Sequence, residues 1–314
     1  MELFELPEFA AGLAAGAIFA FLAGLPGMVS ALLGTRRSFP LGGVAFVVAA
    51  IVALDSDAVP VFPALALGGI AAAAAARALV GTTRAVLAAA PFAGVLALGF
   101  DPDGTWLGSA VFVGAAVVSV VVASFEDVWR AEPIGPAMFA LSVLGVALSV
   151  PDTEHVAALA GAVLPVAAFG WPLGLLRWGR AGSGASVALV VWVGAIDSRA
   201  RPASFLATIA CFGLLLAFPI AEWLRQRRSG LRPLVNLRFA TGSPDIARFR
   251  DLEPSALVVL TIAVHGAFVL GAARLAGGFE SVAATAIVAS TCLVCALAVA
   301  IVLGSRARGT LRQD

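Results

Sequence analysis

Long apolar runs separated by short charged intervals make up almost the whole chain. A helix needs about 17 to 25 mostly apolar residues to cross a membrane, and eleven runs reach or approach this length. Because a helix satisfies its own backbone hydrogen bonds in hydrocarbon, the pattern predicts an all-α, polytopic integral membrane helix bundle, with residues 1–314 as a single transmembrane domain. The runs lie at about residues 9–33, 39–54, 59–79, 85–100, 106–124, 134–150, 155–176, 184–196, 203–223, 255–274 and 281–303.

The charged intervals differ in sign from one side of the predicted membrane to the other. Loops after odd-numbered runs hold 17 of the 20 arginines, seven of them in a long basic loop at residues 224–254. Loops after even-numbered runs hold mainly acids, such as Asp55, Asp57, Asp101 and Asp103. Since short arginine-rich loops stay in the cytoplasm, we predict a multi-pass protein of a bacterial plasma membrane, with the N-terminus outside and the C-terminus inside.

Composition agrees with a lipid environment. The chain is 61% hydrophobic and 12% charged, whereas soluble domains carry about 25% charged residues, so a water-soluble globule is excluded. All 20 basic residues are arginine and tyrosine is absent, which excludes lysine Schiff-base chemistry and acid catalysis by tyrosine. The charges do not gather into a basic domain, so no nucleic-acid partner is expected. Residues 1–5 are acidic and no cleavage site follows the first run, which predicts that this run remains as a membrane anchor.

A few residues within the apolar runs are candidates for special roles. His265 lies near the middle of the tenth run, where it is either a proton relay or a hydrogen-bonded helix contact. Gly12 and Gly16 have the spacing of a close helix contact, which predicts packing within the chain, with a homodimer interface as the alternative. The three cysteines all lie in apolar runs and are expected to pack as small hydrophobic residues rather than form disulfides or a zinc site.

The predicted cytoplasmic loops contain groups that can bind a metal ion or a phosphate. Glu126 and Asp127 directly follow the fifth run. Paired carboxylates can hold magnesium on a phosphate substrate, and the alternative is a solvated helix end beside Arg130. The loop at 224–254 could bind an anionic headgroup or a pyrophosphate. Its arginines could instead serve only to set orientation against an acidic leaflet.

Four short segments resemble, in the same order, the cytoplasmic motifs of the polyprenyl-phosphate N-acetylhexosamine-1-phosphate transferases, glycosyltransferase family 4, which include the phospho-N-acetylmuramoyl-pentapeptide transferases. The similarity spans most of the chain, and the order of the segments is more specific than any one of them. The segments are Arg36-Arg37-Ser38-Phe39-Pro40-Leu41-Gly42-Gly43, Ser124-Phe125-Glu126-Asp127 with Gly135 beyond it, Trp178-Gly179-Arg180-Ala181-Gly182-Ser183, and Pro219-Ile220-Ala221-Glu222 followed by Arg225, Arg227 and Arg228.

The resemblance implies ten or eleven helices and an active site made from cytoplasmic loops, where magnesium assists transfer of a phosphosugar from a UDP carrier to polyprenyl phosphate. The chain departs from the family at most of the family's acids. Arg77 and Arg180 replace aspartates, Ser124 replaces an asparagine, and residues 224–254 lack the family's histidine motif. Asp127 is the one retained acid and therefore the candidate catalytic residue. A single carboxylate beside two arginines binds magnesium poorly, so we expect no metal or other cofactor and no transfer of the usual kind.

Two functional hypotheses follow. In the first, the chain is a pseudoenzyme that binds a membrane lipid such as polyprenyl phosphate or regulates cell-envelope glycolipid synthesis, because guanidinium groups can replace the ion's charge on a phosphate. In the second, it is a small-molecule or lipid transporter, with His265 and the helix-breaking Pro26, Pro63 and Pro219 along the path. For the first, the candidate substrate-binding residues are Arg77, Arg84, Ser124, Arg180, Gly182, Ser183, Arg225, Arg227 and Arg228.

Overall fold

The computed structural model describes residues 2–35, 38–54, 68–69, 135–149, 154–179, 182, 185–190 and 193. These residues are mostly helical, which confirms the helical class for this part of the chain. The elements are the 3-10 helix η1 (Glu2–Glu5) and the α-helices α1 (Pro7–Leu32), α2 (Gly42–Ala53), α7 (Gly135–Ser149) and α8 (Glu154–Gly170). The four α-helices occupy the first, second, sixth and seventh predicted runs.

Helix α1 is, among the described helices, the one with the length and composition of a membrane span or a signal sequence. Pro7 begins it, at a position where a missing N–H costs no helical hydrogen bond. Its 26 residues extend about 39 Å at 1.5 Å per residue, longer than the roughly 30 Å of a bilayer's hydrocarbon core. Pro26 lies inside α1 without ending it. Only 33% of the apolar span is buried, and the exposed side chains include Ile18, Phe21 and Leu22.

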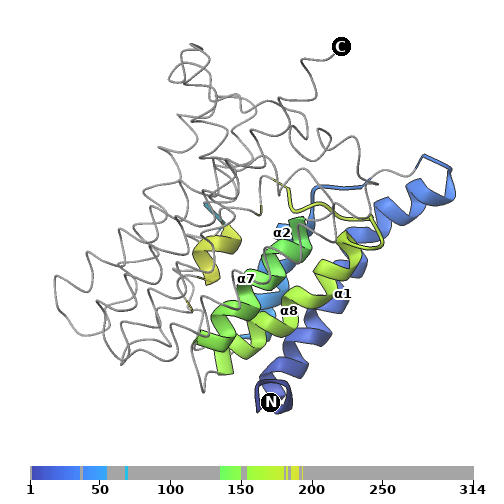
Figure 1. The fold of residues 1–314 in the computed structure, drawn as a ribbon. Helices are drawn as coiled ribbons and strands as arrows, with labels where there is room; N and C mark the ends of the chain where they lie inside the picture. Colours follow the sequence, from blue (N-terminus) through green and yellow to red (C-terminus); the bar gives the residue numbers. More distant parts are fainter. Residues whose placement is uncertain are drawn as a thin grey trace, which may run out of the picture.

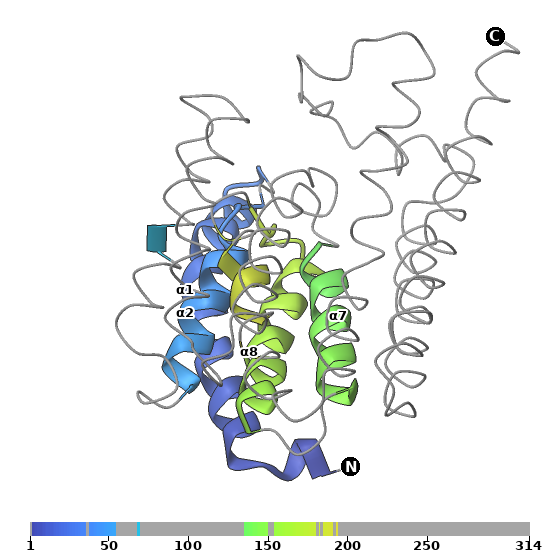
Figure 2. The same ribbon diagram turned by 90° about the vertical axis from the view of Figure 1, so that its left-hand side faces the viewer.

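The four helices lie side by side, with α8 in contact with the other three (Figures 1 and 2). The first turns of α1 and α8 and the last turn of α2 line one pocket. At the opposite end, the start of α2 pairs with the chain that follows α8, and Phe139 near the start of α7 contacts Phe46 of α2. Helices α1 and α8 therefore run in one direction, and α2 and α7 run in the other.

Small residues allow α1 and α8 to pack closely. A Cβ atom added to Gly12 or Gly16 would overlap the backbone carbonyl of Ala158 or Ala162 on α8. A Cβ on Gly161 of α8 would in turn overlap the Phe9 carbonyl of α1. The described contacts of Gly12 and Gly16 are therefore made within the chain, which is the packing role that their spacing predicts.

The predicted ends of two helices are wrong. The run at 155–176 predicts a helix to residue 176, but α8 ends at Gly170 and is followed by a turn at residues 171–173. The run at 39–54 predicts a helix from residue 39, but α2 begins at Gly42. At the start of α2, Phe39 forms a parallel β-bridge with Leu176: its N–H donates to Leu175 O, and its carbonyl accepts from Arg177 N.

At the end of α8 the reason is local. Pro172 follows two positions after Gly170, and the N–H groups of Gly174, Leu175 and Leu176 turn back to the carbonyls of Phe169 and Gly170.

The remaining predictions fall largely on other residues. Within the eighth run, residues 185–190 and 193 are helical as predicted. Outside the described residues lie the third run, apart from residues 68–69, the fourth, fifth, ninth, tenth and eleventh runs, the loop at 224–254, His265 and the three cysteines.

Candidate functional site

The candidate site is the junction between residues 38–43, which lead into α2, and residues 175–182, which follow α8. We call this the loop junction. Phe39 donates its N–H to Leu175 O at 3.0 Å and accepts from Arg177 N at 2.8 Å. Gly42 N and Gly43 N then donate to Arg177 O and Trp178 O at 2.9 and 2.8 Å. These carbonyls satisfy the first two amides of α2, so neither amide is available to an anion.

Glycines let the two segments of the loop junction approach each other's backbone. A Cβ atom on Gly182 would overlap Gly43 and the amide of Val44, and one on Gly43 would lie 2.9 Å from Trp178 Nε1. Gly179 has φ 81° and contacts the carbonyl of Pro40. Gly182, predicted as a substrate-binding residue, therefore serves backbone packing in the described contacts.

Gly179 combines a left-handed backbone with a close contact, and a matched pair of variants separates the two. Gly34 has a similar φ of 77°, but no atom of the described residues lies within 4 Å of an added Cβ. We expect Gly34→Ala to lower the free energy of unfolding by about 1 kcal/mol, the cost of a left-handed alanine. Gly179→Ala should cost about 2 kcal/mol or more, because overlap with Pro40 adds to that strain. Thermal unfolding in detergent measures both, and equal losses would contradict the contact at Gly179.

Trp178 anchors the loop junction to the helices. It is fully buried, and its Nε1–H donates to Ser186 Oγ at 3.0 Å. Its ring centroid lies 4.2 Å from that of Phe139 on α7 and 5.7 Å from that of Phe46 on α2. The two phenylalanine rings are 5.4 Å apart. We call these three residues the aromatic cluster. Sequence reasoning missed it, since each ring lies in or beside an apolar run that offers many hydrophobic positions.

Arg177 holds the same two segments together from another side. Its Nη2 donates to Ser38 O at 3.0 Å, and the bond is part-buried. The sequence pattern indicates for Arg177 only that it is one of the 17 arginines in loops after odd-numbered runs. The residues next to Arg177 in the sequence do not reveal this hydrogen bond, because its acceptor lies 139 positions away along the chain.

The structure places few of the predicted site residues. Gly182 is at the loop junction as described above. The others lie outside the described residues, namely Arg77, Arg84, Ser124, Asp127, Arg180, Ser183, Arg225, Arg227 and Arg228. The described residues of the loop junction carry no carboxylate, so they do not supply the oxygen ligands that magnesium prefers.

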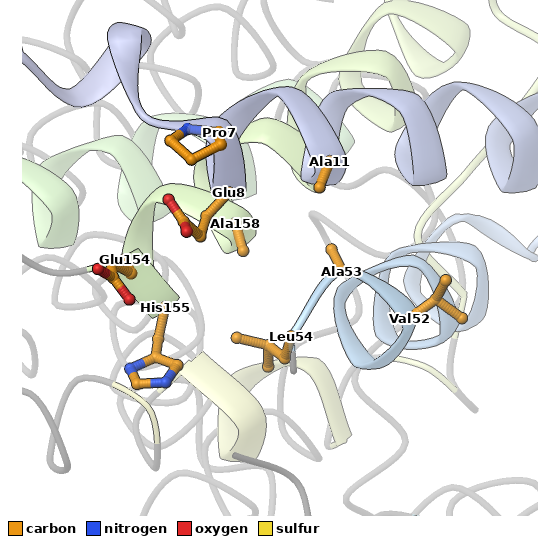
Figure 3. A pocket seen from close by; sticks show the side chains of 9 residues that line it. All are labelled: Pro7, Glu8, Ala11, Val52, Ala53, Leu54, Glu154, His155 and Ala158. Carbon is orange, nitrogen blue, oxygen red and sulfur yellow. The ribbon is translucent and has the colours of Figure 1, made fainter. Parts of the chain in front are cut away.

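The opposite end of the described helices holds a pocket with a cavity volume of about 420 Å³. Glu8, Glu154 and His155 line one part of it, and apolar side chains including Val52 and Leu54 line another (Figure 3). Glu8 and Glu154 lie in the first turns of α1 and α8, where a carboxylate interacts favourably with the helix dipole. Among the described residues, no group of three or more histidine, cysteine or acidic side chains is placed to hold a metal ion.

Comparisons with known proteins assign the chain to no family. No model of a known protein family matches the chain, and no curated protein matches it.

Proposed function

We propose that the chain is a multi-pass membrane protein that binds a polyprenyl phosphate at its cytoplasmic face, on a scaffold like that of the polyprenyl-phosphate phosphosugar transferases, without their magnesium-dependent transfer. The observation that carries the proposal is the loop junction. Two segments that resemble family motifs, residues 36–43 and 178–183, are 135 or more positions apart in the sequence, yet Gly43 N donates to Trp178 O at 2.8 Å and Gly182 packs on the backbone of Gly43.

The directions of the described helices support a membrane-spanning arrangement. If eleven helices alternate in direction, the first and seventh run one way and the second and sixth run the other. Helices α1 and α8, and α2 and α7, which occupy these positions, have those directions. The exposed apolar side chains of α1 suit contact with lipid. In this arrangement the loop junction lies on the side that holds 17 of the 20 arginines, and Glu8 and Glu154 lie outside.

The residue types favour binding over transfer. Arg77 and Arg180 take places where the family has aspartates, and Asp127 is the one acid retained. Guanidinium groups bind phosphate through paired hydrogen bonds without a metal ion. Ser124 and Ser183 would add hydroxyl donors beside them. The proposed role is therefore to hold the lipid phosphate, in a binding or regulatory step of cell-envelope glycolipid synthesis.

Reversal of charge at Arg180 tests the proposal. In lipid nanodiscs, the wild-type protein should bind polyprenyl phosphate and not the uncharged polyprenol. Arg180→Asp should weaken binding at least about ten-fold, because a hydrogen bond to a charged group contributes about 1.5–3 kcal/mol and 1.4 kcal/mol is ten-fold in affinity. Arg199→Asp, on a predicted outer loop, is the matched control and should bind like wild type.

Three outcomes would count against this function. Absence of polyprenyl phosphate binding by the wild type would reject it. Equal weakening by Arg180→Asp and Arg199→Asp would indicate a general effect of charge rather than a site. Magnesium-dependent release of UMP from a UDP-sugar would show that the chain is an active transferase.

A further inference from the structure

Three of the four segments that resemble family motifs lead to the aromatic cluster of Phe46, Phe139 and Trp178. Phe46 lies on α2, three positions after Gly43. Phe139 lies on α7, four positions after Gly135, which trails the motif that contains Asp127. Trp178 itself begins the third segment. The buried aromatic cluster therefore connects three of these segments, with rings up to 132 positions apart in the sequence.

Described residues on both sides of Arg180 in the sequence have well-defined contacts. Before it, the Trp178 ring is enclosed by Phe46 and Phe139, with all three side chains fully buried. After it, Ser186 accepts the Trp178 Nε1–H at 3.0 Å, and Gly182 packs on the backbone of Gly43. Trp178, two positions before Arg180, and Gly182, two positions after it, are thus both packed against α2.

We infer that Trp178 is a positioning residue for the lipid-phosphate site, acting through its bond to Ser186 to hold the segment of Arg180 in place. The inference rests on the proposed function. Paired hydrogen bonds between a guanidinium and a phosphate demand a set orientation, and a site whose supporting residues are fixed by packing pays less ordering cost when the ligand binds. Trp178 does not touch the phosphate itself, because its ring is buried among Phe46, Phe139 and Ser186.

Two variants remove the same hydrogen bond from opposite sides. Trp178→Phe keeps an aromatic ring but loses the N–H donor, and Ser186→Ala loses the acceptor. Affinity for polyprenyl phosphate in nanodiscs should fall about three- to ten-fold in each, the fold-change of one net hydrogen bond. The double variant should be no weaker than the more affected single variant. Phe9→Leu, at the other end of α1, is the control for general loss of stability and should bind like wild type.

A second comparison tests whether Trp178 acts through Arg180. In an Arg180→Ala background, Trp178→Phe should change affinity less than two-fold, since the group that it positions is gone. An undiminished effect in that background would overturn the inference.

The inference and the proposed function fail in distinguishable ways. If the wild type does not bind polyprenyl phosphate, both are rejected. If the wild type binds and Arg180→Asp does not, while folded Trp178→Phe and Ser186→Ala bind like wild type, the function stands and the positioning role is rejected. Should Trp178→Phe fail to fold, Ser186→Ala decides the question alone.

Discussion

Replacement of Trp178 by alanine is expected to lower the free energy of unfolding by about 3–5 kcal/mol, the usual range for removal of a buried large aromatic ring. The side chain is fully buried and contacts Phe139 and Phe46. Alanine would leave a cavity between α2 and α7, and Ser186 Oγ would lose the hydrogen bond that it accepts from Trp178 Nε1–H. The loss is therefore expected near the upper end of this range.

Thermal unfolding in detergent, followed by near-ultraviolet circular dichroism, measures this effect. Phe21→Ala is the control: it also removes an aromatic ring from an apolar helix, but Phe21 is 46% exposed. Its loss should stay below about 1 kcal/mol, because little packing inside the chain disappears. A Trp178→Ala protein as stable as Phe21→Ala would show that the aromatic cluster does not hold these elements together.

Replacement of Gly16 by leucine is expected to cost about 3 kcal/mol or more. Overpacking of a close contact usually costs about 1–3 kcal/mol, and here the neighbour is the backbone of Ala162, which cannot rotate away as a side chain can. Helices α1 and α8 would have to separate along the face that Gly12, Gly16 and Gly161 bring together.

The matched control lies one position further along the same helix. Ala17 is exposed, so Ala17→Leu adds similar apolar volume to α1 without meeting α8 and should leave stability within about 0.5 kcal/mol of wild type. The fraction folded in increasing denaturing detergent compares the two variants. A smaller loss for Gly16→Leu than for Ala17→Leu would contradict the close α1–α8 contact.

Local pattern was sufficient to predict that the described elements are helices and roughly where they lie. The run at 134–150 predicts α7 to within one residue at each end, and the run at 9–33 predicts α1 to within two. Each run is apolar over a continuous stretch, and the hydrogen bonds of a helix join residues four apart. The spacing of Gly12 and Gly16 likewise indicated a close helix contact, because small residues on one face permit it.

The candidate site was predicted less completely. The resemblance directed attention to residues 36–43 and 178–183, and these are the segments whose described residues meet at the loop junction. It assigned Gly182 to substrate binding, whereas the described contacts of Gly182 are with Gly43 and Val44. It gave no role to Trp178 or Arg177. A motif match identifies which residues stand together in sequence, but packing is what assigns each one a neighbour.

The sequence by itself determined the helical character of the described part, the approximate extent of its four helices and the separation of arginines from acids, since all three depend on residues close together in the chain. Only the tertiary structure decided that α2 begins at Gly42. It also decided that the first two amides of α2 donate to the carbonyls of Arg177 and Trp178. The physical reason is that Phe39 bonds to Leu175 O and Arg177 N, and bonds between positions so distant in sequence leave no local pattern.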